Sequence, residues 1–172
     1  MSTLAKSIAH VINLNSGKLT GRTRLQKTFY ILESYGVELG IDFQYHHYGP
    51  YSEELSIAID DAIALGFISE DKKLTNKFQT YSIFSSLTDE DSNYFDKNLD
   101  VIASRLLSTL SSYDTITLEL AATADFLSEA GFESDPWLET KIRKASKATD
   151  ERMAKAKRLL DEIHALNVEL VN

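Results

Sequence analysis

The chain has 172 residues, of which 43% are hydrophobic and 26% are charged, and its formal net charge is −8. This length allows one sizeable core or two small cores packed together. The absence of cysteine excludes disulfides, cysteine nucleophiles and thiolate metal sites. No apolar run is long enough to span a membrane, and the N-terminus has no apolar signal core, so we expect a cytoplasmic protein.

The beginning of the chain predicts two helices. One covers residues 3–14, and the other starts after Thr20 or Thr23, either of which can cap it, and runs to about Ser34. Each helix has an apolar stripe at helical spacing. The stripes consist of Leu4, Ile8, Val11 and Ile12 in the first helix and of Leu25, Phe29 and Leu32 in the second.

Basic side chains cluster at the start of the second helix, at Arg22, Arg24 and Lys27. Positive charge at this end opposes the helix dipole, which costs about 0.3 kcal/mol or more per residue. Two explanations for this cost remain open. The three side chains pair with acidic groups of the same domain, or they form a binding site for an anion or an acidic partner.

An aromatic stretch and a proline mark the next elements. Residues 43–48 are rich in Phe and Tyr, which predicts a short strand. Gly49-Pro50 is expected to end this strand, because proline cannot donate to a ladder. A helix over residues 52–65 follows, with Ser52 as its cap and an acidic first turn.

A hairpin completes the first half of the chain. Residues 67–70 and 79–85 predict its two strands, which are separated by polar turns. Three helices followed by a hairpin is the element order of a winged helix. Residues 1–87 are therefore predicted to form a winged-helix-like subdomain.

Residues 88–172 predict helices only, so the expected fold class is mainly α with a minor β part. Helix starts are indicated by a capping box at 88–91, by Asp114, by Asp135-Pro136, and by Thr149 or Asp150. The side chains expected to face the core include Trp137, Leu138, Ile142, Met153, Ala156, Leu160, Ile163 and Leu170. The loops are short, so we expect this helical subdomain to pack against the first as one compact unit.

The charge is unevenly distributed over the second half. Residues 88–140 contain 2 basic and 12 acidic residues, net −10, whereas residues 141–158 contain 8 basic and 2 acidic residues, net +6. Two solvated helix faces explain this distribution most simply. Pairing between the two segments and a charged docking surface are the alternatives.

Two stretches resemble a known family. They are Leu25-Gln-Lys-Thr-Phe-Tyr-Ile-Leu and Tyr48-Gly-Pro-Tyr-Ser-Glu-Glu-Leu, and the specific similarity covers about residues 20–70. The pattern resembles the YwgA-like family, which is similar to the broader Panacea antitoxin domain. A weaker similarity returns at Leu118-Glu-Leu-Ala-Ala-Thr and in residues 141–163.

The resemblance implies a role in protein contacts rather than in catalysis. Panacea-like domains include antitoxins that neutralise toxins by direct contact and adaptors that deliver a partner to a protease. No catalytic residue accompanies the motif. Panacea domains commonly end the second motif with Gly-Pro-Val, whereas this chain has Gly49-Pro50-Tyr51-Ser52, which favours the YwgA-like branch.

The residue pattern gives no support for metal binding or catalysis. His46 and His47 are adjacent, so in a strand they point to opposite faces and cannot share one metal ion. We expect one of them to pack in the core and the other to lie in a groove. The sequence contains no nucleophile elbow, glycine-rich phosphate loop or Walker lysine. It therefore predicts no metal, no cofactor and no enzymatic activity.

DNA binding is the alternative function, because winged helices commonly bind DNA through their third helix and wing. The outward positions of the 52–65 helix are acidic, however, which opposes contact with phosphates. They are Glu53, Glu54, Asp60 and Asp61. A basic edge remains available as a non-standard DNA contact, and it would consist of Lys72, Lys73 and Lys77 together with Arg22, Arg24 and Lys27.

The sequence thus predicts a protein-interaction module, antitoxin-like or adaptor-like, with an unidentified protein partner. Its alternative is a winged-helix transcriptional regulator that uses the basic edge. The predicted partner-binding surface lies where the two motifs meet, because arginine and tyrosine often anchor protein interfaces. Its residues are Arg22, Arg24, Lys27, His46, His47, Tyr48 and Tyr51. Packing of the aromatic residues under the C-terminal helices is the competing explanation.

Overall fold

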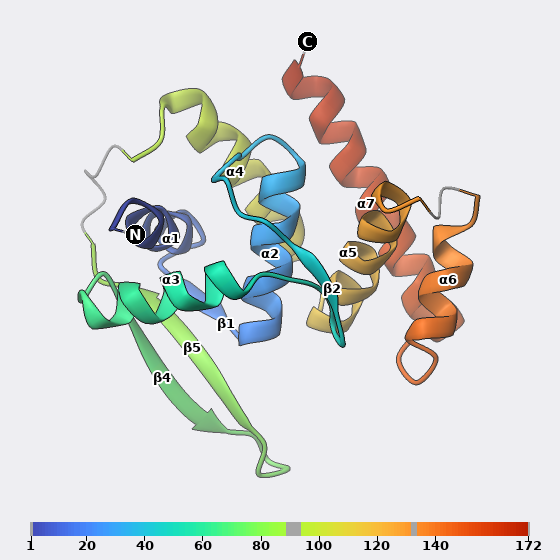
Figure 1. Ribbon diagram of the computed structural model, residues 1–172, viewed down its shortest axis with the longest axis horizontal. Coiled ribbons are helices and arrows are strands. Elements are labelled where there is room, and N and C mark those ends of the chain that lie inside the picture. Colours follow the sequence, from blue (N-terminus) through green and yellow to red (C-terminus); the bar gives the residue numbers. More distant parts are fainter. Residues whose placement is uncertain (1, 89–93, 132–133, 172) are drawn as a thin grey trace.

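Helices predominate in the computed structural model, which describes residues 2–88, 94–131 and 134–171 (Figure 1). The helices are α1 (Ser2–Leu14), α2 (Arg22–Ser34), α3 (Glu53–Ala64), α4 (Lys97–Ser111), α5 (Thr115–Glu129), α6 (Pro136–Arg143) and α7 (Asp150–Val171). The strands are β1 (Lys18–Thr20), β2 (Gln44–His46), β3 (Gly49–Tyr51), β4 (Ile68–Leu74) and β5 (Thr80–Ser86). The fold is mainly α with a minor β part, as predicted, and the described strands form two small antiparallel sheets.

The predicted hairpin belongs to a three-stranded sheet with the order β1-β5-β4. Strand β1, which the sequence analysis did not identify, pairs Leu19 with Phe84 of β5, and both side chains are buried. Strand β4 is longer than predicted and continues to Leu74, so the outer part of the hairpin projects from the body as a wing (Figure 1). Three helices, α1, α2 and α3, precede this hairpin in the chain, and β1 and the strands β2 and β3 lie between them.

The second sheet is a short hairpin of β2 and β3 with His47-Tyr48 in its turn. The prediction that Gly49-Pro50 ends the strand was wrong, because Pro50 lies in β3 and pairs with Tyr45. Proline is tolerated there because both strands of a two-stranded sheet are edge strands. Gly49 has φ +85°, in the left-handed region that favours glycine.

Three of the predicted helix caps are present. The side chains of Ser52, Asp114 and Asp135 accept hydrogen bonds from backbone N–H groups in the first turns of α3, α5 and α6. The last helix starts at Asp150, as predicted. The cap predicted for α2 was wrong, because Gly21 is its N-cap and neither threonine caps it.

Helix α4 starts later than the sequence indicated. Asp96 caps it by accepting a hydrogen bond from the Leu99 amide, and its first residue is Lys97. The predicted capping box at 88–91 therefore does not start this helix. Residues 89–91 themselves lie outside the described residues.

Helix α6 is oriented differently from the prediction. Leu138 and Ile142 were expected to face the core, but they are 54% and 63% exposed, and Trp137 is only partly buried. The helix is short and buries Thr140 instead. In α7, the predicted core residues Met153, Ala156, Leu160 and Ile163 are buried, whereas the burial of Leu170 lies outside the description.

One buried apolar cluster extends through both halves of the chain. It includes Ile8 of α1, Phe29 of α2, Leu106 of α4, Leu118 of α5 and Ile163 of α7. The division of the chain into two subdomains after residue 87 stays a prediction. None of the described helices combines the length and the apolar character needed to cross a membrane.

A tight contact between Gly49 and α5 leads to a stability prediction. A Cβ atom at Gly49 would lie 2.4 Å from Oγ1 of Thr123, so Gly49→Ala should lower the free energy of unfolding by about 2–4 kcal/mol. Gly40→Ala is the matched control, because Gly40 also has positive φ but has no neighbouring atom within 4 Å, and it should cost about 1 kcal/mol. Urea denaturation measures both.

The contact itself is tested by combining variants. In a Thr123→Ala background, which lacks the hydroxyl oxygen, Gly49→Ala should cost little more than Gly40→Ala. Equal costs for the two glycine variants in the otherwise unchanged protein would contradict this prediction.

Candidate functional site

The two motif stretches meet in space through Gln26. Its amide nitrogen donates to the Ser52 carbonyl and its amide oxygen accepts from the Ser52 N–H, both at 2.9 Å. The same nitrogen also donates to Oγ of Ser56 at 3.0 Å. One buried side chain of α2 therefore holds the backbone at the start of α3, which explains why the two motifs occur together.

Lys27 makes the second link between the motifs. Its side chain is 1% exposed, and Nζ donates to the carbonyl oxygen of Pro50 at 2.5 Å. Burial is the main cause that lowers the pKa of Lys27, to about 8, and the neighbouring Lys144 and Lys147 lower it further, while Glu119 opposes the shift. A charged lysine is costly in this position unless it is paired and hydrogen-bonded.

A buried carboxylate of α5 forms ion pairs with two further lysines close to Lys27. Glu119, which is almost fully buried, forms ion pairs with Lys144 at 3.1 Å and Lys147 at 2.8 Å. Lys144 also donates to the carbonyl oxygen of His47, in the β2–β3 turn, at 2.6 Å. Together with Lys27, three ammonium groups thus surround one carboxylate, and this part of the protein carries an excess of positive charge.

The weaker similarity noted in the sequence contributes to this junction. Glu119 and Thr123 belong to the stretch Leu118-Glu-Leu-Ala-Ala-Thr, and Thr123 packs against Gly49 of the second motif. All three stretches therefore converge on the β2–β3 turn. Two lysines of the basic segment at 141–158, Lys144 and Lys147, pair with Glu119 of the acidic segment at 88–140. Pairing between these two segments was one of the alternatives for the uneven charge distribution.

A small hollow of about 150 Å³ opens beside Lys27, between α2, α3 and the β2–β3 turn. Among the described residues that line it, every side chain except Ile59 carries a hydrogen-bond donor, and none is a carboxylate. The lining consists of Arg22, Thr23, Gln26, Lys27, Tyr48, Tyr51, Ser56 and Ile59. We call the surface around this hollow the motif face, defined by Arg22, His46, His47, Tyr48 and Tyr51.

The predicted aromatic and imidazole residues lie near the hollow. Tyr48 is 55% exposed, and Tyr51 is partly buried with its hydroxyl 2.8 Å from Oγ of Ser56. His46 stacks on Tyr51 with 4.9 Å between ring centroids. The prediction that one histidine packs in the core was wrong, because His46 and His47 are both exposed on this short hairpin.

The three basic residues of α2 have separate roles. Arg22 is exposed and donates two hydrogen bonds to Glu70 of β4, at 3.0 and 3.1 Å, which raise its pKa. Arg24 turns away from the motif face and donates to the carbonyl oxygens of Leu110 and Tyr113 at the end of α4. Lys27 is buried. The sequence analysis placed all three on one surface, and Arg24 does not belong to it.

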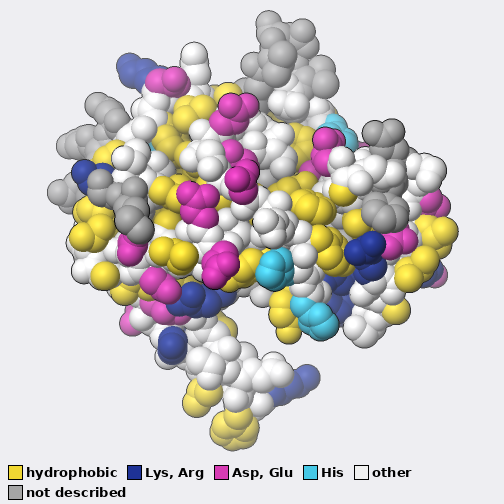
Figure 2. Space-filling model, viewed as in Figure 1, with side chains coloured by type: hydrophobic (Ala, Val, Ile, Leu, Met, Phe, Trp, Pro, Cys, Tyr) yellow, Lys and Arg dark blue, Asp and Glu magenta, His cyan; other side chains and the backbone are white. Residues whose placement is uncertain are grey.

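The six basic residues of the predicted DNA-binding edge are likewise separated from one another in the structure. Lys72, Lys73 and Lys77 are exposed on the wing, but Arg24 and Lys27 are occupied by backbone carbonyls inside the protein. Acidic side chains lie over α3 (Figure 2). The six basic residues therefore do not form one continuous edge.

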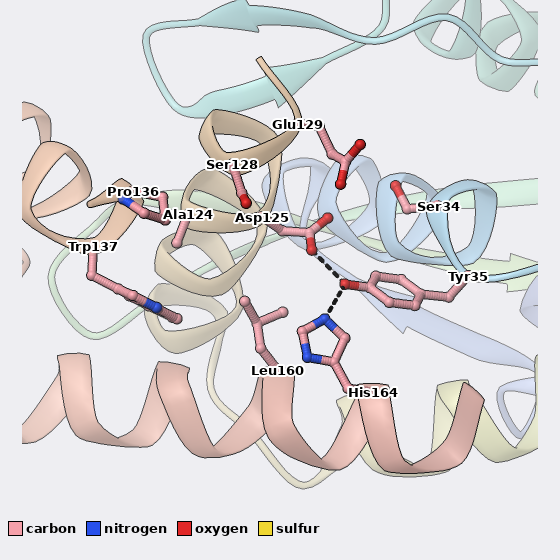
Figure 3. A pocket seen from close by; sticks show the side chains of 10 residues that line it. All are labelled: Ser34, Tyr35, Ala124, Asp125, Ser128, Glu129, Pro136, Trp137, Leu160 and His164. Carbon is pink, nitrogen blue, oxygen red and sulfur yellow. Dashed lines mark hydrogen bonds between the residues drawn. The ribbon is translucent and has the colours of Figure 1, made fainter. Parts of the chain in front are cut away.

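A second and larger hollow lies between the ends of α2 and α5, the start of α6, and α7 (Figure 3). Asp125 accepts hydrogen bonds from the hydroxyls of Tyr30, at 2.8 Å, and Tyr35, and the Tyr35 oxygen lies 2.9 Å from Nε2 of His164. We call this hollow the Tyr35 pocket. The sequence analysis did not identify these residues, because each is isolated in the sequence and only the packing of α2, α5 and α7 brings them together.

Comparisons with known proteins agree with the motif similarity. The chain is 29% identical over 151 residues to "Uncharacterized protein YwgA" of Bacillus subtilis (strain 168), which covers 87% of this chain and 90% of that protein. No protein-family model matches the chain. The similarity to this relative thus extends well beyond residues 20–70, where the two specific motifs lie.

The lowered pKa of Lys27 leads to a prediction about stability and pH. Between about pH 8 and the ordinary lysine pKa of 10.5, the unfolded chain binds more protons at this residue than the folded protein does. The destabilising effect of the charged Lys27 is therefore complete below pH 8 and is lost as the pH rises through this window. The free energy of unfolding contributed by Lys27 should rise accordingly.

Urea denaturation between pH 7 and pH 10 measures this effect. Lys27→Met should reduce the rise, to which the lowered pKa of Lys144 also contributes, whereas Lys97→Met, which changes an exposed lysine at the start of α4, should retain it in full. The slope with pH is compared rather than the absolute stability, because Lys27→Met also removes the donor to Pro50. Parallel pH profiles for the unchanged protein and Lys27→Met would contradict the prediction.

Proposed function

We propose that this protein is a protein-interaction module whose partner binds the motif face. The observation that carries the proposal is the hollow beside Lys27, whose described lining residues supply hydrogen-bond donors and no carboxylate. A group that fills it must accept hydrogen bonds and balance positive charge. We therefore infer that the partner contributes an acidic side chain, because a carboxylate meets both requirements and is small enough for about 150 Å³.

The excess of positive charge below the hollow supports an acidic partner. Lys27, Lys144 and Lys147 share the single carboxylate of Glu119. Lys144 and Lys147 also lie over the ring of Tyr48, with Nζ at 5.8 and 4.9 Å from its centroid. A carboxylate bound beside Lys27 would lower the electrostatic cost of this cluster, which favours binding.

The side chains around the hollow support a macromolecular partner. Tyr48 is more than half exposed although it belongs to a motif, and exposed tyrosines supply large contact area at a low entropy cost. The β2–β3 hairpin that presents it is held by Lys27 and Lys144 through backbone carbonyls. This surface is thus rigid before binding, which reduces the entropy lost on association.

The biological role that we propose follows from the resemblance. The motif similarity to Panacea-like domains suggests a cytoplasmic antitoxin or an adaptor for proteolysis, both of which act by binding another protein. The structure of the motif face is compatible with either role. An antitoxin partner would be a toxin, and an adaptor partner would be a protease or its substrate.

The proposal predicts that a negative charge at Tyr48 prevents partner binding. Tyr48→Glu should eliminate the partner that co-purifies with the tagged protein from cells of its source, and for the purified partner it should weaken binding at least about tenfold. Leu65→Glu is the matched control, because Leu65 is also 55% exposed but caps the C-terminal end of α3, away from the motif face at its start. Both variants should keep the melting temperature of the unchanged protein.

Two further observations separate the possible outcomes. Binding of the purified partner should weaken as salt is added, because the contact pairs opposite charges. Equal retention of the partner by Tyr48→Glu and Leu65→Glu would contradict the proposal. Binding of the purified partner that does not change with the salt concentration would also contradict it.

The alternative function, transcriptional regulation through DNA binding, is favoured by the exposed wing lysines Lys72, Lys73 and Lys77. We predict no sub-micromolar binding of random duplex DNA through α3, because its exposed carboxylates repel phosphates. Fluorescence anisotropy at low ionic strength measures this. Affinity that is lost on changing α3 would refute the prediction, and affinity that depends on the three lysines would favour DNA binding by the wing.

A further inference from the structure

The Tyr35 pocket is a cavity of about 430 Å³, distinct from the motif face and within the size range of sites for small molecules. One wall is apolar, with Trp137 and Leu160, and the other carries Asp125, Glu129 and His164. Figure 3 shows the Tyr35 hydroxyl between the Asp125 carboxylate and the His164 ring, with Trp137 on the other side. None of the described residues that line this cavity is a lysine or an arginine.

The hydrogen bonds fix where the protons lie. Asp125 accepts from Tyr30 and Tyr35, so the one hydroxyl proton of Tyr35 points toward Asp125. The Tyr35 oxygen is therefore an acceptor for His164, whose Nε2 carries a hydrogen. Burial, and next the charge of Asp125, raise the pKa of Tyr35, so this hydroxyl stays protonated.

Both carboxylates of the pocket can still accept hydrogen bonds. A carboxylate has about four acceptor positions, and the two tyrosines occupy only two of those on Asp125. Among the described residues, no lysine or arginine forms a salt bridge with Asp125 or with Glu129, which is exposed at the rim. The pocket thus carries two negative charges that lack a cationic partner in this part of the structure.

The side chains around the two carboxylates favour an organic cation over a metal ion. The described residues contain no cluster of three or more side chains that could hold a metal ion. An indole and a leucine side chain instead form an apolar wall opposite the carboxylates, and an aromatic face also attracts cations. The Trp137 ring already attracts one cation, because Nζ of Lys157 lies 5.6 Å from its centroid. Lys157 itself is not among the residues that line the pocket.

We propose that the Tyr35 pocket binds a small organic cation, with its ammonium group between Asp125 and Glu129 and its hydrocarbon part against Trp137 and Leu160. The ammonium group donates hydrogen bonds to the two carboxylates. The Tyr30–Asp125–Tyr35–His164 network holds the Asp125 carboxylate in position. This site does not depend on the function proposed for the motif face.

Trp137 provides the measurement, because it is the only tryptophan in the chain and lies in the pocket wall. Titration of the full-length protein with phenethylamine should change the tryptophan fluorescence saturably. The neutral isostere 2-phenylethanol should bind at least about tenfold more weakly, because it cannot form charge-assisted hydrogen bonds. Cyclohexylamine serves as a second cationic probe of different shape.

Variants assign the binding to this pocket. Glu129→Gln should weaken amine binding about tenfold while the protein stays folded, because Glu129 is exposed. Glu54→Gln, an exposed carboxylate on α3, should leave the affinity unchanged. Asp125→Asn should weaken binding further, and the Glu129 variant decides the question if Asp125→Asn does not fold.

Three results would overturn the proposal. They are the absence of saturable binding of both amines up to about 10 mM, equal affinities for phenethylamine and 2-phenylethanol, and an unchanged amine affinity in Glu129→Gln.

Discussion

Lys27 places an ammonium group inside the protein and uses it to hold the carbonyl oxygen of Pro50. Much of the structure is arranged around this contact. The β2–β3 hairpin is positioned from one side by Lys27 and from the other by Lys144, and both lysines lie next to the buried Glu119 of α5. Buried charges are stable only when they are paired and hydrogen-bonded. This requirement couples α2, the hairpin, α5 and the segment after α6 into one unit.

The same contact explains how a binding surface arises on an acidic protein. The one negative charge of Glu119 does not balance the positive charges of three lysines. The region below the hollow is therefore positive, although the chain carries a net charge of −8. The hairpin above it projects Tyr48 and two histidines into solvent. The Tyr35 pocket has the opposite character, because its described lining includes two carboxylates and neither lysine nor arginine. The two hollows therefore differ in the sign of the charge around them.

Local patterns predicted much of the fold but less of the candidate site. The caps at Ser52, Asp114 and Asp135 were correct because capping depends on residues within one helical turn. The start of α4 and the inward direction of Leu138 and Ile142 were wrong, because both depend on which neighbour covers a helix. Arg24 was placed on the motif face because spacing along α2 cannot reveal that the end of α4 lies beside it.

By itself, the sequence determined most of the helices and the β4–β5 hairpin, because propensity, capping and periodicity act over a few residues. Only the tertiary structure decided what the motifs do. Gln26 reaches Ser52, Lys27 reaches Pro50, and Lys144 reaches the turn at His47 across most of the chain. The Tyr35 pocket likewise required the packing of α2, α5 and α7, since Tyr35, Asp125 and His164 are far apart in the sequence and share no pattern.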